Sequence, residues 1–72
     1  MSASVRFQEV LRMLEQCARG FTWRRTTHGR KVEFNHMVFR DLPKFDDIEI
    51  GHIRKMCRHF NILDCARKFN VV

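Results

Sequence analysis

The sequence has few of the residues that build flexible or phosphate-binding loops. It holds three glycines and one proline in 72 residues, and the glycines do not cluster into a phosphate-binding loop. No apolar run approaches the length of a membrane-spanning helix, and the opening MSASVRFQEV lacks the apolar segment of a secretory signal. We therefore expect neither a membrane protein nor a protein that holds a nucleotide in a Gly-rich loop.

The chain is short, and it shows no repeats, linkers or low-complexity segments. We expect a single domain over residues 1–72. A domain of this size buries only about 60% of its unfolded surface, so it has no room for a deep catalytic cleft. The apolar content of 44%, with seven phenylalanines and one tryptophan, is enough for one compact core. Any active site must therefore lie on the surface.

The cysteines are few and odd in number: Cys17, Cys57 and Cys65. They occupy apolar periodic positions, which predicts reduced core thiols and a cytoplasmic protein. A buried thiol is also a poor nucleophile. Among cysteines and histidines only Cys57-x-His59 has a short ligand spacing, and no second pair matches it. We therefore predict no metal ion and no cofactor.

Helical periodicity covers residues 4–18, where apolar side chains recur every three or four positions. Ser4 is a candidate N-cap, and Gly20 is a candidate stop because glycine enters the left-handed conformation without steric cost. A second amphipathic helix follows residue 49, with Asp46 and Glu49 spaced as a capping box and Asn61 as a left-handed C-cap. Residues 63–69 either add a short third helix or fray.

Between the helices the period changes to two, as on half-buried strands. Phe21 and Trp23 alternate with polar residues, and Trp23 is expected in the core, with an exposed platform as the alternative. Residues 26–30 contain the glycine that a hairpin turn needs, and residues 35–36 could make a second tight turn. A third strand over 37–42 ends at Pro43, with its inward face left ambiguous. The order predicts an α+β two-layer sandwich of helix, three-stranded antiparallel sheet and helix.

Charge favours a polyanionic partner. Fourteen lysines and arginines against eight acidic residues give a net charge of +6, which is high for so short a chain. Such clusters bind phosphates by releasing counterions. The other interpretation is a solvated surface that keeps the protein soluble. The candidate nucleic-acid-binding residues are Arg24, Arg25, Arg30, Lys31, Arg54, Lys55 and Arg58.

His28 stands alone among arginines in the first predicted hairpin turn. It is either a polar turn residue or a general acid–base, because histidine titrates near neutral pH. RNA carries its own nucleophile, the 2′-OH. A protein that cleaves RNA then needs only a base and a positive group near the phosphate, and both fit on an open surface.

The arrangement resembles the HicA family, the small ribonuclease toxins of HicA–HicB toxin–antitoxin systems. The segment ARGFTWRRTTH matches the family's Gly-aromatic strand and histidine signature, MVFRDLP its strand before a proline, and IEIGHIRKMCRHFNI its closing helix. The resemblance covers residues 6–62. It implies a double-stranded-RNA-binding-domain-like fold, metal-independent cleavage of mRNA with His28 as the catalytic residue, and a HicB-like antitoxin as protein partner.

Two departures from the family keep other interpretations open. Thr26-Thr27 replaces the family's Gly-Ser, and Lys44-Phe45 occupies the region where a further histidine often stands. The alternative is a non-catalytic module that binds nucleic acid or an acidic protein by charge, such as a small phage or host regulator. A third possibility is an assembly subunit that uses exposed Phe39, Phe45 or Phe69.

Overall fold

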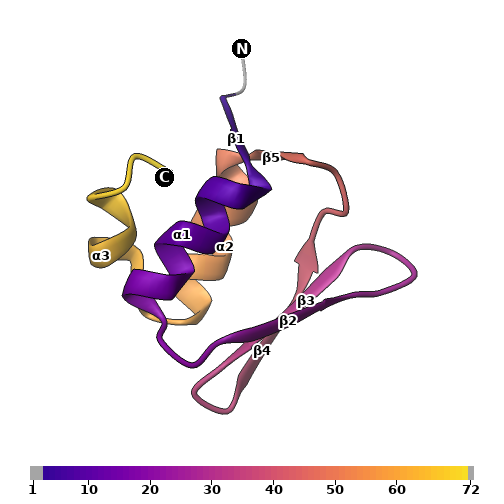
Figure 1. The fold of residues 1–72 in the computed structure, drawn as a ribbon, viewed down its shortest axis with the longest axis horizontal. Helices are drawn as coiled ribbons and strands as arrows, with labels where there is room; N and C mark the ends of the chain where they lie inside the picture. The colour runs from indigo at the N-terminus through magenta and orange to yellow at the C-terminus, as the bar shows by residue number, and fades with distance from the viewer. Residues whose placement is uncertain (1–2, 72) are drawn as a thin grey trace.

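The computed structural model describes residues 3–71 of the chain and has an α+β fold. Helices lie before and after a three-stranded antiparallel sheet, as predicted (Figure 1). The elements in chain order are β1 (Ser4–Arg6), α1 (Phe7–Cys17), β2 (Thr22–Arg25), β3 (Arg30–Phe34), β4 (Met37–Leu42), β5 (Asp47–Glu49), α2 (Ile50–His59) and α3 (Leu63–Arg67).

The main sheet is a meander in the order β2-β3-β4. The turn between β3 and β4 is the predicted tight turn at residues 35–36. Asn35 and His36 have φ values of 52° and 67°. Two successive left-handed residues suit the right-handed twist of a hairpin, which is why asparagine is favoured there. Met37–Leu42 is confirmed as a strand, and Pro43 follows it.

An irregularity in the pairing of β3 with β4 resolves the ambiguous face of β4. Val32 pairs with Phe39 and Arg30 pairs with Leu42, so two steps along β3 match three steps along β4. The extra residue is a β-bulge, which places both Phe39 and Leu42 in the core. The bulge also leaves both intervening residues, Arg40 and Asp41, exposed to solvent.

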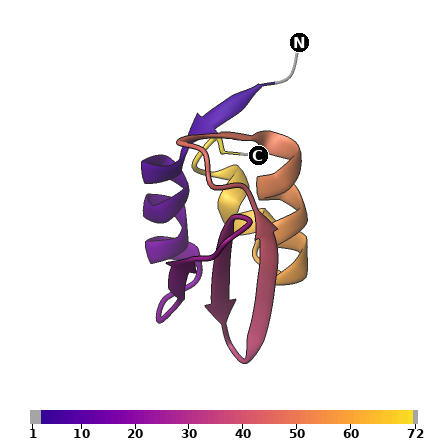
Figure 2. The ribbon, with the colours of Figure 1, turned by 90° about the vertical axis from the view of Figure 1, so that its right-hand side faces the viewer.

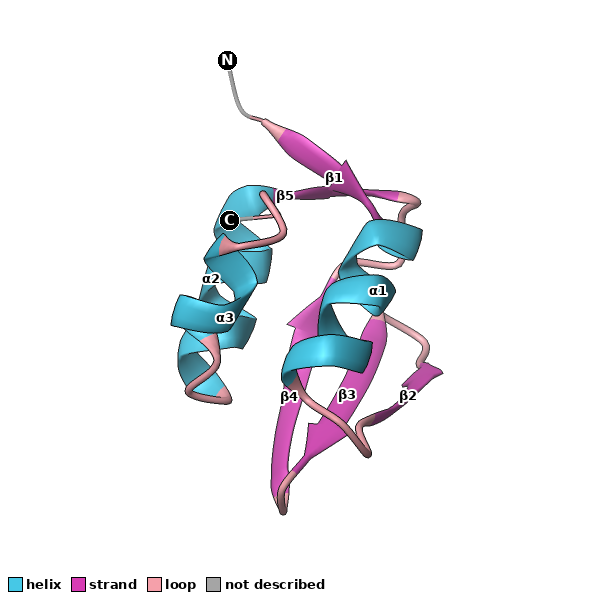
Figure 3. Ribbon diagram, turned by 60° about the vertical axis from the view of Figure 1, so that its left-hand side comes forward, coloured by secondary structure: helices cyan, strands magenta, loops and turns pink. Residues whose placement is uncertain are grey.

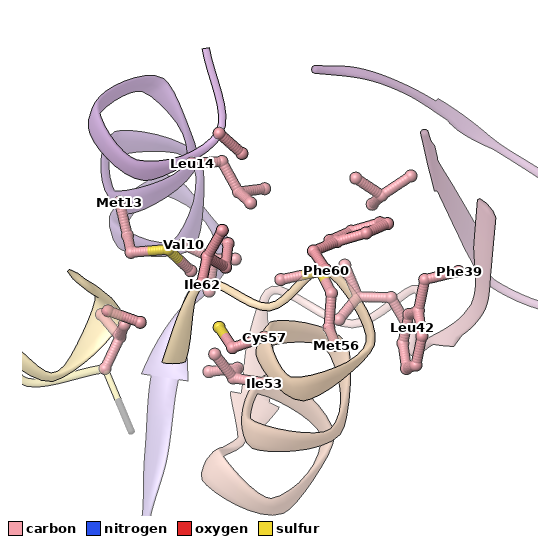
Figure 4. Packing of buried hydrophobic residues seen from close by; sticks show 14 of the residues in the cluster. Val10, Met13, Leu14, Phe39, Leu42, Ile53, Met56, Cys57, Phe60 and Ile62 are labelled. Carbon is pink, nitrogen blue, oxygen red and sulfur yellow. The ribbon is translucent and has the colours of Figure 1, made fainter. Parts of the chain in front are cut away.

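The helices pack together on one face of the main sheet (Figure 2). Figure 4 shows Phe39 and Leu42 of the sheet facing Met56 and Phe60. Ile53 and Cys57 of α2 turn instead toward α1. A fully buried aliphatic or aromatic side chain stabilises the fold by about 1.5–3 kcal/mol. The core therefore holds the sheet from one side and leaves its other face open.

The predicted start of the first helix was wrong, because residues 4–6 form a strand. Ser4 is not the N-cap: β1 pairs with β5, and α1 begins only at Phe7. The N–H of Phe7 donates to the carbonyl of Asp46 at 2.7 Å. The loop residue just before β5 thus satisfies one of the backbone donors that begin a helix, so no capping side chain is needed.

The predicted capping box at the second helix was also wrong. Glu49 is itself the N-cap residue, in extended conformation, and no side chain caps the helix. The N–H of Ile50 donates to the carbonyl of Ala3 at 3.1 Å. The pairing of β1 with β5 thus connects the start of α1 to the start of α2 (Figure 3). Neither three-residue strand is long enough to show a period in sequence.

The ends of the helices agree with the glycine and asparagine signals. Gly20 has φ of +88° three residues after α1 ends, and Asn61 has φ of +59° after α2. The short helix predicted after residue 62 is present as α3, with Ala66 buried. Each left-handed residue lets the chain reverse where a helix stops.

The prediction of three reduced cysteines was wrong for two of them. Cys17 at the end of α1 and Cys65 in α3 form a disulfide, with their Cα atoms 5.7 Å apart. The third cysteine, Cys57, is free and buried, and burial raises the pKa of its thiol to about 12. The pairing depends on α3 packing beside α1, which the spacing of 48 residues does not reveal.

Candidate nucleic-acid interface

The turn that carries His28 is packed against the end of β4. The N–H of Thr26 donates to the carbonyl of Gly29 at 2.7 Å and closes the turn. Gly29 is buried, and a Cβ added there would lie 2.5 Å from the carbonyl oxygen of Leu42. A side chain at Gly29 would therefore push the turn away from β4. The glycine allows this close approach of two backbone segments.

His28 itself is exposed, and it lines an open hollow of about 410 Å³. The β4 bulge supplies Arg40 and Asp41 to this hollow, and the loop after β4 supplies Lys44 and Phe45. The fold thus brings His28 together with two cations that lie at least twelve residues away in sequence. Neither Arg40 nor Lys44 was among the predicted nucleic-acid-binding residues.

Arg30 holds the loop after β4, which lines one side of this hollow. The Arg30 side chain is 3% exposed, and its Nη1 donates to the carbonyls of Pro43 and Phe45, each at 2.8 Å. Its guanidinium carbon lies 3.7 Å from the centre of the Phe7 ring, a cation–π contact. Burial lowers the pKa of Arg30, and the positive charge of Arg25 lowers it further.

Arg30 is therefore a structural residue. It was predicted to contact nucleic acid, but its guanidinium is buried and is used within the protein. The prediction relied on the place of Arg30 in a basic cluster that flanks the hairpin, although charged side chains are rarely buried unless they are paired. Here two backbone carbonyls and an aromatic ring replace the ion-pair partner.

A second positive region covers the open face of the main sheet. Arg24 and Lys31 are cross-strand partners on β2 and β3. Lys31 Nζ lies 3.0 Å from Glu33 Oε1, and this hydrogen bond is the main cause that lowers the pKa of Glu33. The positive charges of Arg24 and Arg40 lower that pKa further. Arg24, Lys31 and Glu33 line one hollow on this face of the sheet.

Arg40 joins the two positive regions. It lines the His28 hollow, and its positive charge also lowers the pKa of Glu33 on the sheet face. We call the set Arg24, Lys31, Arg40, Lys44 and His28 the hairpin surface. It spans β2, the turn between β2 and β3, β3, β4 and the loop after β4. The separation between its members in sequence explains why a search for local charge clusters found only part of it.

The other predicted basic residues lie elsewhere. Arg54, Lys55 and Arg58 are exposed on α2, which packs against the opposite face of the sheet. Arg25 is exposed and pairs with the buried Arg30 in the β2–β3 register. The structure therefore divides the predicted residues between two sides of the molecule and does not assemble them into one surface.

Trp23 was expected in the core, but it is 41% exposed. Its ring packs edge-on against Phe7, with the centroids 4.8 Å apart. The reason is that β2 is the edge strand of the sheet, and the Trp23 ring is covered on one side only. Alternation along a strand predicts which face a residue occupies but not how far the core extends beneath it.

The described residues contain no group of three or more His, Cys, Asp or Glu side chains placed to hold a metal ion. No helix within residues 3–71 is long and apolar enough to cross a membrane. No protein-family model, no curated protein and no solved structure matches the chain.

Proposed function

We propose that the protein is an RNA-binding, toxin-like endoribonuclease in which His28 is the general acid–base. The observation that carries the proposal is the hollow that His28 shares with Arg40 and Lys44. A phosphate placed there meets two cations and an imidazole, the side chain most often used as a general acid–base. The exposed location suits a polymer substrate, which cannot enter a closed pocket.

The reaction needs no group beyond this surface and the RNA itself. His28 accepts the proton of the 2′-OH as its oxygen attacks the adjacent phosphorus. Arg40 and Lys44 stabilise the negative charge that develops on the phosphoryl oxygens. The bond from phosphorus to the 5′-oxygen then breaks, and that oxygen takes a proton from the imidazolium or from water. The products are a 2′,3′-cyclic phosphate and a 5′-hydroxyl.

The resemblance to HicA toxins supports this proposal, since it puts the family's catalytic histidine at His28. It also implies a HicB-like antitoxin that neutralises the protein by covering the hairpin surface. The cytoplasmic location predicted from the cysteines is kept as part of the proposal. In the cytoplasm, thiol reductants would tend to reduce the Cys17–Cys65 disulfide to two thiols. The family's glycine before the histidine is absent. Gly29, directly after His28, lets the turn approach β4.

The test is cleavage of a long single-stranded RNA in the presence of EDTA. Three proteins are compared: the parent, His28→Asn, and His36→Asn as the matched control. Both histidines are exposed turn residues at opposite ends of β3, and asparagine tolerates either turn. We expect His28→Asn to lose about 10²- to 10⁴-fold in rate, the range for a general acid–base. We expect His36→Asn to cleave like the parent.

Circular dichroism controls for folding of both variants. Equal cleavage by His28→Asn and the parent would exclude the mechanism. Loss of cleavage in both variants would point to a structural effect.

A non-catalytic binding module is the second candidate. The observation that favours it is the positive open face of the sheet, where Arg24 and Lys31 lie outside the His28 hollow. Such a module would retard RNA on a gel, with strong salt dependence, and would release no fragments from parent or variants. Binding that is indifferent to salt would exclude it.

A further inference from the structure

Phe45 is exposed to an unusual degree for its size. Its side chain is 66% exposed, against 41% for Trp23 and 38% for Phe69, the other exposed aromatic residues. An isolated exposed phenylalanine is not an apolar patch of the kind that docks a protein partner. A flat ring of this kind does match one face of an unpaired nucleobase.

The ring projects from a backbone that is held in place. The carbonyl of Phe45 accepts a 2.8 Å hydrogen bond from the buried Arg30, as does the carbonyl of Pro43 two residues earlier. Arg30 is in turn stacked on Phe7 in the first turn of α1. The loop is therefore tied to the core although its side chains face solvent. A fixed backbone lowers the entropy lost when the ring binds a ligand.

The neighbours of the ring favour nucleic acid over a neutral ligand. Phe45 lines the same hollow as His28, Arg40 and Lys44. Asp41 also lines it, and its carboxylate disfavours a phosphate at its own position. Arg40 and Lys44 remain as the groups that can receive phosphates. An aromatic ring that shares a hollow with cations is the arrangement that binds single strands, with bases stacked and phosphates paired.

We propose that Phe45 stacks against an unpaired nucleobase next to the phosphate held at the hairpin surface, and so restricts the substrate to single-stranded RNA. The inference rests on the proposed function for its ligand class. In duplex RNA the base faces are stacked on one another and cannot reach the ring. The cations alone would bind both forms, so Phe45 supplies the discrimination.

The test measures binding rather than cleavage. Full-length His28→Asn protein is titrated into a fluorescein-labelled 12-nucleotide RNA, single-stranded or annealed to its complement, and anisotropy is recorded. Added to this background are Phe45→Leu, which keeps an apolar side chain without a ring, and Phe45→Trp, which keeps the stacking. Phe69→Leu is the matched control, because Phe69 is also exposed but lies beyond α3 beside α1.

We expect Phe45→Leu to weaken single-strand binding by about 5- to 100-fold, the range that one base–aromatic stack provides. Phe45→Trp should restore the parent affinity. Duplex binding should be unchanged in all variants, and Phe69→Leu should behave like the parent. The proposal is overturned if Phe45→Leu lowers single-strand and duplex affinity alike, or if it leaves the single-strand affinity unaltered.

This outcome is separable from that of the proposed function. A parent protein that cleaves no RNA while its single-strand binding depends on Phe45 would refute the cleavage and leave the stacking role standing. A parent protein whose cleavage depends on His28 but whose single-strand binding does not depend on Phe45 would support the cleavage and refute the stacking role.

Discussion

The two turns of the main sheet both carry an exposed histidine, yet their surroundings differ. His28 lies in a turn packed against β4, in a hollow with Arg40 and Lys44. His36 lies in the two-residue turn at the other end of β3, and the hollow beside it has Glu33 as its charged neighbour. His28 thus shares its hollow with two cations and the carboxylate of Asp41, whereas the charged side chain in the His36 hollow is the carboxylate of Glu33.

This difference shows that residue type alone does not define a candidate site. Both turns present an imidazole, but only His28 has an arginine and a lysine among the residues that line its hollow. The β4 bulge makes the distinction, because it exposes Arg40 and Asp41 at the His28 end of the strand.

The largest expected effect is that of reducing the disulfide, which tests whether the contrast is local. Cys17–Cys65 closes a span of 48 residues that includes both turns. Loss of this constraint should lower the free energy of unfolding by about 4 kcal/mol in the chain-entropy account. The disulfide lies among the helices, so cleavage should still require His28 and not His36.

The measurement is urea denaturation with and without a phosphine reductant. The Cys17→Ser/Cys65→Ser variant is the control, and it should show no response to reductant. An unchanged unfolding midpoint for the parent would mean that the disulfide adds no stability. If the reduced protein stays folded and its cleavage of RNA depends on neither His28 nor His36, the two turns do not differ in function.

Gly29→Ala should disturb the His28 turn alone. The added methyl group would meet the carbonyl oxygen of Leu42 at 2.5 Å, and two backbone segments must separate. We expect a loss of about 3 kcal/mol, the upper part of the range for overpacked sites. Gly51→Ala is the control, since it has open space in α2 and should be neutral or stabilise the helix by up to about 1 kcal/mol.

Urea denaturation measures both variants, with the slope of the transition as a check on two-state unfolding. A Gly29→Ala protein as stable as the parent would show that the turn is free to move off β4. The hollow would then not be a fixed feature of the surface.

Arg40→Gln and Lys44→Gln should each remove one phosphate contact. For single-stranded RNA the slope of log affinity against log salt should become shallower by about 0.7 per residue. Arg54→Gln, an exposed arginine on α2, is the matched control. Arg54 was predicted from sequence to bind nucleic acid, so the three variants compare the two sides of the molecule directly. If Arg54→Gln changed the salt slope more than Arg40→Gln and Lys44→Gln do, the RNA-binding surface would lie on α2.

The sequence was most informative where a local signal determines the structure. Helical and alternating periods located α1, α2 and the three main strands, and the glycine and asparagine signals located the chain reversals. The missed features all depend on contacts between distant segments. The pairing of β1 with β5, the burial of Arg30 and the disulfide between Cys17 and Cys65 have no local pattern.

The candidate site follows the same division. His28 was identifiable from its turn and its flanking arginines. Its partners Arg40 and Lys44 were not, because the β4 bulge and the Arg30-held loop bring them to the turn. A bulge shifts a strand by one residue, and alternation in sequence cannot show it.

The smallest expected effect is a gain in stability from His36→Gly. His36 has φ of +67°, a conformation that glycine adopts without a steric penalty, and Asn-Gly is the favoured pair for a two-residue hairpin turn. We expect a gain of about 0.5–1 kcal/mol, which raises Tm by roughly 2–8 °C in a domain of this size. Thermal denaturation followed by circular dichroism measures it.

RNA cleavage should be unchanged, because this turn lacks the cations of the His28 end. A drop in Tm would mean that the His36 side chain makes a contact that stabilises the fold by more than glycine gains by removing the backbone strain at this position. A drop in cleavage at unchanged Tm would make the two turns functionally alike, against the contrast drawn from their charges.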